Sequence, residues 1–119
     1  MSSNFDQAAR EEVDYGEYFR PVREVRVIKK DGSRENFNVQ KVINAVAKSA
    51  YRALTKFTAE DERRICQDVI DKVNEMEQDE IPIPVMHNIV ESALEQVKPV
   101  VAKSYRDYRN YKQDFVRML

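Results

Sequence analysis

The sequence predicts an α+β fold in which one β-hairpin is followed by four α-helices. Apolar and charged residues alternate along residues 22–30, and an Asp-Gly-Ser turn separates that run from a shorter one at residues 34–38. This pattern is typical of two paired strands. From residue 39 onward, apolar residues recur at three- and four-residue spacing, which is typical of helices with one buried face. Prolines and capping residues divide this part into four segments.

Length and charge divide the chain into an arm and one domain. The 119 residues are enough for a single domain with a modest core. Residues 1–21 are acidic, lack a sustained apolar period and end at Pro21, which predicts a flexible N-terminal arm that could hold one helical turn. The domain itself is expected to cover residues 22–119.

The hairpin is expected to close through the three-residue loop Asp-Gly-Ser. This register pairs Lys29 with Glu35 and Val27 with Phe37, and it places these four side chains on one face. A two-residue loop would pair Phe37 with Arg26 and bury less apolar surface. The longer loop is therefore favoured.

Each helix has a recognisable start. Asn38 is suited to cap a helix over residues 39–54, and the Thr58–Asp61 pair resembles a capping box that opens a helix over residues 58–76. Two prolines favour extended backbone before the helix over residues 84–97.

Pro99 suits the first position of the last helix. No stop signal closes that helix before Leu119, so we expect it to continue into a longer protein.

Composition argues against several classes of protein. Two glycines, Gly16 and Gly32, cannot supply a P-loop or a dinucleotide fingerprint. The single cysteine and the single histidine leave no disulfide framework, thiolate zinc site or catalytic triad, so we expect no enzymatic activity and no metal site. No apolar run approaches the roughly 18 residues of a membrane span. Together with the absence of a secretory segment at the start of the chain, this predicts a cytoplasmic protein without a membrane partner. The overall acidity and the absent basic stripe argue against a nucleic-acid partner.

Cations at unusual places are the candidate binding residues. Lys29 and Lys30 lie at the hairpin turn, and Lys41 lies in the first turn of a helix, where a cation opposes the helix dipole unless an anion binds there. Lys112 interrupts the apolar stripe of the last helix, so it either extends to water, pairs with an acid or faces an anion. The position of His87 alone favours a partly exposed surface histidine.

Three stretches together resemble an ATP-cone domain. V-I-K-K-D-G-S-R-E-N-F-N-V-Q-K-V-I-N-A-V, at residues 27–46, resembles its opening strand, turn and first helix. I-P-I-P-V-M-H-N-I-V-E-S-A-L and V-V-A-K-S-Y-R-D-Y-R-N-Y-K resemble its third and last helices. The resemblance covers about residues 22–113, with the stretches in the order and spacing of the family.

The resemblance implies an allosteric nucleotide sensor without a catalytic site of its own. ATP-cones usually lie at the N-terminus of ribonucleotide reductase catalytic subunits, where they bind ATP as activator or dATP as inhibitor. It also implies a small three-stranded sheet lying over a four-helix bundle, with the nucleotide beneath the hairpin. The expected partners are ATP or dATP with Mg²⁺, a reductase catalytic domain after Leu119, and further copies in a nucleotide-driven oligomer.

The resemblance assigns five residues to the nucleoside. Val27 and Val42 would line the adenine pocket. Glu35 and Asn38 would form hydrogen bonds with the base. Tyr108 would pack against the nucleotide from the last helix.

Five further residues are assigned to the phosphates or the ribose. Lys29, Lys30 and Lys112 would contact the phosphates, and Lys41 and His87 would lie near the ribose or the phosphates. Lys30 stands where the family often has Arg, which would replace a bidentate phosphate contact by a point charge.

Two other functions stay open. A transcriptional repressor of reductase genes uses the same domain, but its zinc ribbon needs four cysteines, and the 21-residue arm has none. A basic hairpin on a helical domain could also serve as a protein-interaction module unrelated to nucleotides. Nucleotide titration separates that module from a sensor.

Overall fold

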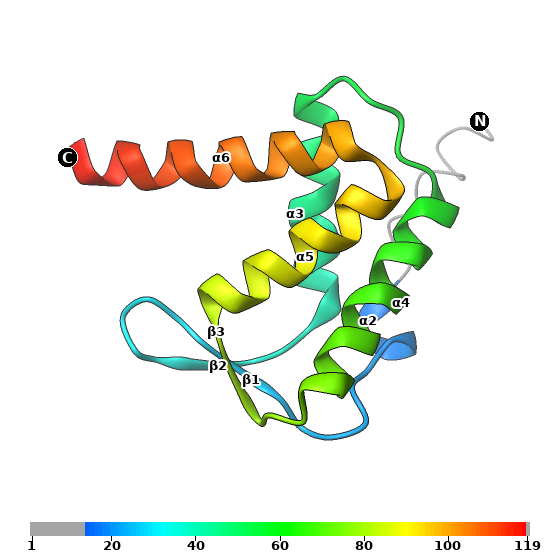
Figure 1. Cartoon of the computed structure of the whole chain (residues 1–119), viewed down its shortest axis with the longest axis vertical. Coiled ribbons are helices and arrows are strands. Elements are labelled where there is room, and N and C mark those ends of the chain that lie inside the picture. Colours follow the sequence, from blue (N-terminus) through cyan, green and yellow to red (C-terminus); the bar gives the residue numbers. More distant parts are fainter. Residues whose placement is uncertain (1–13, 119) are drawn as a thin grey trace, which may run out of the picture.

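The structure, a computed structural model, describes the backbone of residues 14–118 and the side chains of residues 14–109 (Figure 1). The described elements, in chain order, are α2 (Tyr15–Tyr18), β1 (Arg26–Ile28), β2 (Arg34–Asn36), α3 (Val39–Arg52), α4 (Ala59–Met76), β3 (Glu80–Pro82), α5 (Ile83–Val97) and α6 (Pro99–Met118). This confirms the α+β class, with a hairpin followed by four long helices.

The sheet has the expected three strands, and their order is β2-β1-β3. β1 pairs antiparallel with β2 and parallel with β3, so Val27 lies beside Ile81 on the core-facing side. Both side chains are buried. The outer side carries Glu80, whose carboxylate accepts a hydrogen bond from Arg34 Nε at 2.8 Å. The sheet therefore has one apolar and one charged face, which fixes the side on which each hairpin residue lies.

The hairpin register differs from the predicted one. Val27 lies opposite Glu35 and not Phe37. Gly32 explains the change, because its φ of 88° lies in the left-handed region that glycine adopts readily and closes the loop one residue early. Lys29 then donates its N–H to the carbonyl of the residue after Gly32, at 2.8 Å, and does not pair with Glu35 across the backbone. A change of two positions keeps every side chain on its predicted face.

The predicted helix starts are confirmed at α3 and α4. Asn38 accepts a hydrogen bond from the Gln40 N–H at 2.8 Å. Thr58 and Asp61 bond reciprocally to each other's backbone N–H and complete the capping box. These caps satisfy N–H groups that have no partner inside the helix.

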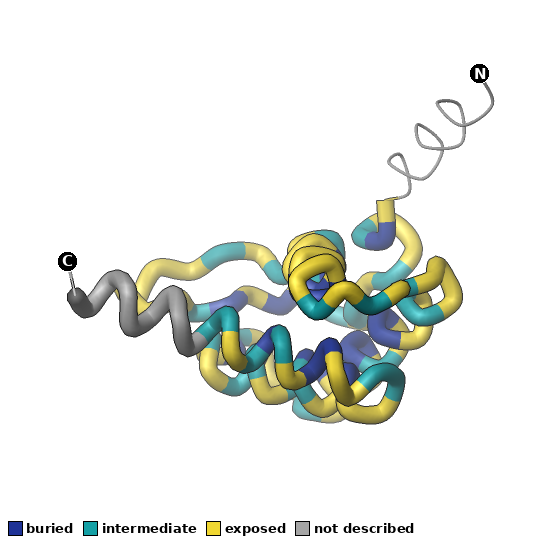
Figure 2. The backbone as a smooth tube through the Cα atoms, turned by 90° about the horizontal axis from the view of Figure 1, so that it is seen from above, coloured by how far each residue is buried: buried dark blue, intermediate teal, exposed yellow. Residues whose placement is uncertain are grey.

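The four long helices pack in cyclic order around an apolar core. α3 packs against α4 and α6, and α5 packs against the same two helices. In Figure 1, α6 runs across α3 and not alongside it, and Figure 2 views α3 nearly end-on. The regular four-helix bundle is therefore not confirmed. Fully buried core side chains include Val39, Val46, Ile65, Val69, Val73, Ile81, Val90, Leu94 and Val101.

The last part of the predicted arm contributes to this core. Tyr15 of α2 is buried; its hydroxyl donates to Glu62 of α4 at 2.6 Å, and its N–H donates to the Gln40 side chain at 2.8 Å. The helical turn that the arm could hold is α2. One buried aromatic residue makes no periodic pattern, so the sequence carries no signal for this contact. Residues 1–13 lie outside the described part.

Candidate functional site

One group of predicted site residues meets where the hairpin reaches the start of α3. Glu35 lies opposite Val27 and shares its core-facing side. Because Asn38 caps α3, Lys41 lies in the first turn. The Lys41 Nζ donates to Glu35 Oε2 at 2.5 Å, and the Lys29 Nζ lies 3.5 Å from Glu35 Oε1. We call Lys29, Glu35 and Lys41 the hairpin–α3 corner.

The hairpin–α3 corner carries one more positive than negative charge. The hydrogen bond from Lys41 holds the pKa of the Glu35 carboxyl below its usual range; desolvation opposes this effect, and Lys29 adds to it. Glu35 also offsets the cation that the first helical turn disfavours. The side chains of Lys29 and Lys41 are 52% and 63% exposed, so an anion from solution can reach both.

Asn38 and Val42 line the same end of α3. The side-chain oxygen of Asn38 is taken by the cap and lies close to α2, so close that a Cβ on Gly16 would come within 2.4 Å of it. A ligand would therefore meet the Asn38 amide nitrogen. Val42 is half-buried and packs against the core.

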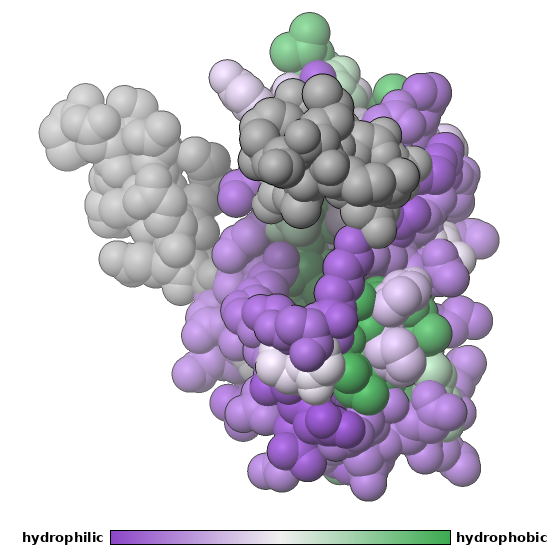
Figure 3. Space-filling view, turned by 90° about the vertical axis from the view of Figure 1, so that its left-hand side faces the viewer, coloured by the Kyte–Doolittle hydropathy of each residue, from purple (hydrophilic) through white to green (hydrophobic). Residues whose placement is uncertain are grey.

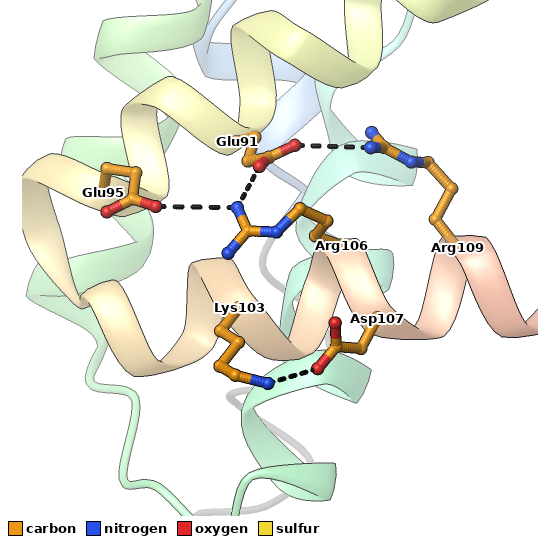
Figure 4. A network of polar contacts seen from close by, with 6 residues as sticks. All are labelled: Glu91, Glu95, Lys103, Arg106, Asp107 and Arg109. Atoms are coloured by element: carbon orange, nitrogen blue, oxygen red, sulfur yellow. Dashed lines mark hydrogen bonds and ion pairs between the residues drawn. The ribbon is translucent and has the colours of Figure 1, made fainter.

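A second group lies between α5 and α6. The ring of His87 meets the ring of Tyr105 edge-on, with centroids 6.2 Å apart, and the Arg109 guanidinium lies 5.9 Å from the same tyrosine ring. Arg109 Nη2 also lies 3.4 Å from Glu91 Oε1, and Arg106 contacts the other oxygen of Glu91 (Figure 4). We call these five residues the α5–α6 seam.

His87 connects this seam to the hairpin. Its pKa is lowered to about 4, chiefly by burial and further by the positive charges of Arg109 and Lys30, while Glu91 opposes the shift. The imidazole is therefore neutral at pH 7. Since Lys30 belongs to the hairpin turn, the structure brings two predicted site residues, Lys30 and His87, within electrostatic reach of each other.

Tyr108 is placed differently. The Arg52 guanidinium lies 3.5 Å from its ring centroid, at the end of α3 that is remote from Lys41. The two side chains line a hollow of about 500 Å³ between the end of α3 and the start of α6. The structure does not bring Tyr108 to the hairpin–α3 corner, and its contact with a nucleotide stays a prediction. Lys112 lies in α6, and its side chain is outside the described residues.

Arg109 is a candidate that the sequence prediction missed. It lies three residues before Lys112 and four after Tyr105, a spacing that puts all three near one side of a helix. This spacing is the signal by which the sequence could have indicated Arg109 as a site residue. An arginine in a highly charged helix, however, is typical of a solvent-exposed face. Only the packing of α6 on α5 shows that Arg109 is largely covered, with 26% of its side chain exposed.

The face on which the hairpin projects carries both hydrophobic and hydrophilic surface. Figure 3 faces the side on which the hairpin projects and shows hydrophobic surface bordered by hydrophilic atoms. Among the residues that the structure describes, no group of three His, Cys, Asp or Glu side chains could hold a metal ion. In the same part of the chain, no helix is long and apolar enough to cross a membrane.

Comparison with known proteins points to one kind of domain. An anaerobic ribonucleoside-triphosphate reductase of Haemophilus influenzae is 38% identical over 88 residues, which are 71% of this chain and 12% of the reductase. A transcriptional repressor, NrdR 2 of Paramagnetospirillum magneticum, is 30% identical over 95 residues, 77% of this chain and 60% of the repressor. The NrdR repressor of Fervidobacterium nodosum is 29% identical over 93 residues, 75% of this chain and 60% of that protein.

The chain thus spans between about one eighth and three fifths of the length of these relatives. A family model described as the ATP cone domain matches residues 25–114, which include both the hairpin–α3 corner and the α5–α6 seam. Because this match covers most of the chain, the protein belongs to the ATP-cone family.

Proposed function

We propose that this chain is a regulatory domain that binds ATP or dATP and thereby controls the overall activity of a ribonucleotide reductase. The observation that carries the proposal is the hairpin–α3 corner, where the carboxylate of Glu35 is held between Lys29 and Lys41. An acceptor for a base and cations for phosphates lie together there. The domain has no chemistry of its own; its output is a change in the protein to which it is joined.

Adenine recognition rests on Glu35 and its apolar neighbours. A carboxylate accepts a hydrogen bond from the amino group of adenine but repels the carbonyl oxygen that guanine carries at the same position. Val27, opposite Glu35, and Val42 of α3 supply apolar surface for the ring. The Asn38 amide would add a second contact to the base.

Phosphate binding would use cations from separate segments. Lys29 and Lys30 belong to the hairpin, Lys41 to α3 and Lys112 to α6, and the charge of Lys30 acts on His87. Each charge-assisted hydrogen bond contributes about 1.5–3 kcal/mol when shielded from water and much less when exposed. The expected affinity is micromolar, which corresponds to about −8 kcal/mol. Mg²⁺ would bind with the triphosphate and offset its charge.

A nucleotide-sensing repressor of reductase genes is the second candidate. It is favoured by the two repressor relatives, of which this chain covers 60% each. The reductase is preferred because its identity to this chain is higher, 38% against 30% and 29%. DNA binding by the full-length protein, measured against salt concentration, would separate the two: a reductase subunit should show no sequence-specific binding.

Titration calorimetry tests the proposal directly. The chain is titrated with ATP, dATP and GTP, each with and without Mg²⁺. We expect micromolar binding of ATP and dATP, weaker binding of GTP, and larger assemblies in light scattering when dATP is bound to the full-length protein. Absence of binding would favour the interaction module instead, and equal affinity for ATP and GTP would contradict the role of Glu35.

A further inference from the structure

Arg109 has a donor that nothing in the described part of the chain uses. Among the buried side-chain nitrogen and oxygen atoms of residues 14–109, its Nη1 is the one without a hydrogen-bond partner. Buried polar atoms in proteins are nearly always paired, and an unpaired guanidinium nitrogen is unfavourable in a medium of low dielectric constant. The unpaired atom therefore indicates a partner that residues 14–109 do not supply.

The neighbours of Arg109 hold one half of its guanidinium and leave the other half, Nη1, without a hydrogen bond. Glu91 accepts the close contact from Arg106, which also lies 3.7 Å from Glu95, and offers Arg109 only one oxygen at 3.4 Å (Figure 4). That distance is long for a charge-assisted hydrogen bond, which is normally about 2.7–2.9 Å. Glu91 therefore orients Arg109 through Nη2 without satisfying it.

Arg109 lies within electrostatic reach of His87, as Lys30 does. The positive charges of Arg109 and Lys30 both lower the pKa of His87, so α6 and the hairpin turn both act on the same imidazole. Glu91 is the acid that acts on His87 from α5. Lys30 offers a point charge, whereas a guanidinium offers a planar fork that matches the oxygens of a phosphate.

We propose that Arg109 is a further phosphate-binding residue, whose Nη1 donates to the outer phosphates of a nucleoside triphosphate while Glu91 and Arg106 hold the guanidinium in place. This inference rests on the function proposed above. It gives the site a bidentate cation that the hairpin lacks, and it makes Glu91 a positioning residue. The ligand class that it selects is a polyphosphate rather than a nucleoside or a monophosphate.

Calorimetry on the whole chain with ATP, AMP and inorganic tripolyphosphate tests the inference. Arg109→Met should weaken ATP and tripolyphosphate binding at least about tenfold, since one shielded charge-assisted contact is lost, and AMP binding less than about threefold. Arg109→Lys keeps the charge but loses the planar fork, so its affinity for ATP and tripolyphosphate should lie between those of the wild type and of Arg109→Met. Lys103→Met is the matched control: Lys103 is an exposed cation on the same helix that pairs with Asp107 instead of facing the seam, and its loss should leave every affinity unchanged (Figure 4).

Two results would overturn the inference in distinguishable ways. If the wild-type chain binds ATP and Arg109→Met leaves the ATP-to-AMP affinity ratio unchanged while lowering Tm, Arg109 only ties α6 to α5, and the proposed function stands. If the wild-type chain binds no nucleotide, the proposed function fails and the inference fails with it. Should Arg109→Met not fold, the ratio measured on Arg109→Lys decides, because that variant keeps the charge beside Glu91.

Discussion

Glu35 and Glu91 each lie between two cations, in surroundings that differ in exposure to water. Glu35, at the hairpin–α3 corner, is 36% exposed, and its partners Lys29 and Lys41 are more than half exposed. Exposed ion pairs contribute little to stability, since solvent screens the charges and the side chains lose entropy on pairing. The hairpin–α3 corner can therefore exchange its partners for a ligand at small cost to the fold.

Glu91, in the α5–α6 seam, is 17% exposed, and both of its partners are arginines from α6. A carboxylate shared by two guanidinium groups crosses the interface between α5 and α6 (Figure 4). Removing such a carboxylate leaves partly buried charge without a partner. The difference teaches that the same three-charge motif is open to partners from solution where it is exposed and fixes the side chains of two helices against each other where it is covered.

The largest effect on ATP affinity is expected from Lys112→Met. This substitution tests whether α6 contacts the ligand at a point beyond the α5–α6 seam. If Lys112 faces the triphosphate, ATP affinity should fall by about 1.5–3 kcal/mol, roughly ten- to a hundredfold, and AMP affinity should fall less. Without ligand, Tm should be unchanged or higher, because a cation leaves a partly apolar stripe. Calorimetry and thermal melts measure the two quantities. An unchanged ATP-to-AMP ratio would make Lys112 an ordinary lysine that extends to water.

His87 is expected to change the free energy of unfolding by about 1–3 kcal/mol between neutral and acid pH. This prediction sharpens the contrast in burial between the α5–α6 seam and the hairpin–α3 corner. Its pKa is about 4 in the folded state, against 6.5 for an unperturbed histidine. The unfolded chain therefore takes up a proton before the folded one does, so stability is full above pH 6.5 and is lost as pH falls toward 4. This loss of stability is smaller than a pKa shift from 6.5 to about 4 would give in full, because the ring is only half-buried and water screens its charge.

Urea unfolding at several pH values between 7 and 4 checks this expectation. His87→Gln should flatten the profile in that window, although carboxylates such as Glu35, whose pKa is lowered, still lose their own contribution toward the acid end. Bound ATP should raise the pKa of His87, since phosphate charge would favour the imidazolium. A wild-type profile that is already flat between pH 6.5 and 5 would show that the ring is solvated.

Matched substitutions of the two carboxylates test the comparison itself. Glu91→Gln should lower Tm by several degrees, since the amide removes the shared counter-charge of Arg106 and Arg109 and leaves Arg106 with Glu95 alone at 3.7 Å. Glu35→Gln should hardly change Tm at pH 7, since its ion pairs are exposed. Thermal melts without ligand measure both. If Glu35→Gln and Glu91→Gln lowered Tm equally, the distinction between Glu35 as a ligand-binding carboxylate and Glu91 as a positioning carboxylate would be wrong.

The smallest effect is expected in base discrimination. Glu35→Gln replaces a group that only accepts hydrogen bonds by one that accepts and donates, so the preference for ATP over GTP should shrink by a few-fold. Competition between the two nucleotides, measured on wild type and variant, reports the change. A preference that survives the substitution would assign base recognition to another residue, with Asn38 the first to examine.

Local signals explain what the sequence could predict. The caps at Asn38 and at Thr58–Asp61 join groups within three residues, so each helix start depends on neighbours alone. The predicted corner residues also lie in one continuous stretch. Their meeting around Glu35 needs only a hairpin followed directly by a helix.

Local sequence signals could not predict the contacts between segments that lie far apart in the chain. Tyr15 bonds to Glu62 across 47 residues, and Arg109 reaches Glu91 across 18. Tyr108 illustrates the same limit, since its helical stripe was recognised but its neighbour Arg52 was not. Each of these contacts depends on how one helix packs on another element. The spacing of apolar residues within a single helix does not determine that packing.

The sequence by itself thus determined the α+β class, the helix starts, the family and the charged residues of the hairpin–α3 corner, because turn, cap and periodicity act over a few residues. The tertiary structure alone decided the hairpin register, the burial of Tyr15 and the arginine–carboxylate contacts of the α5–α6 seam. These features follow from the crossing of α6 over α3 and α5 and from the loop that Gly32 closes. Packing of distant segments selects among arrangements that local propensity leaves equally favourable.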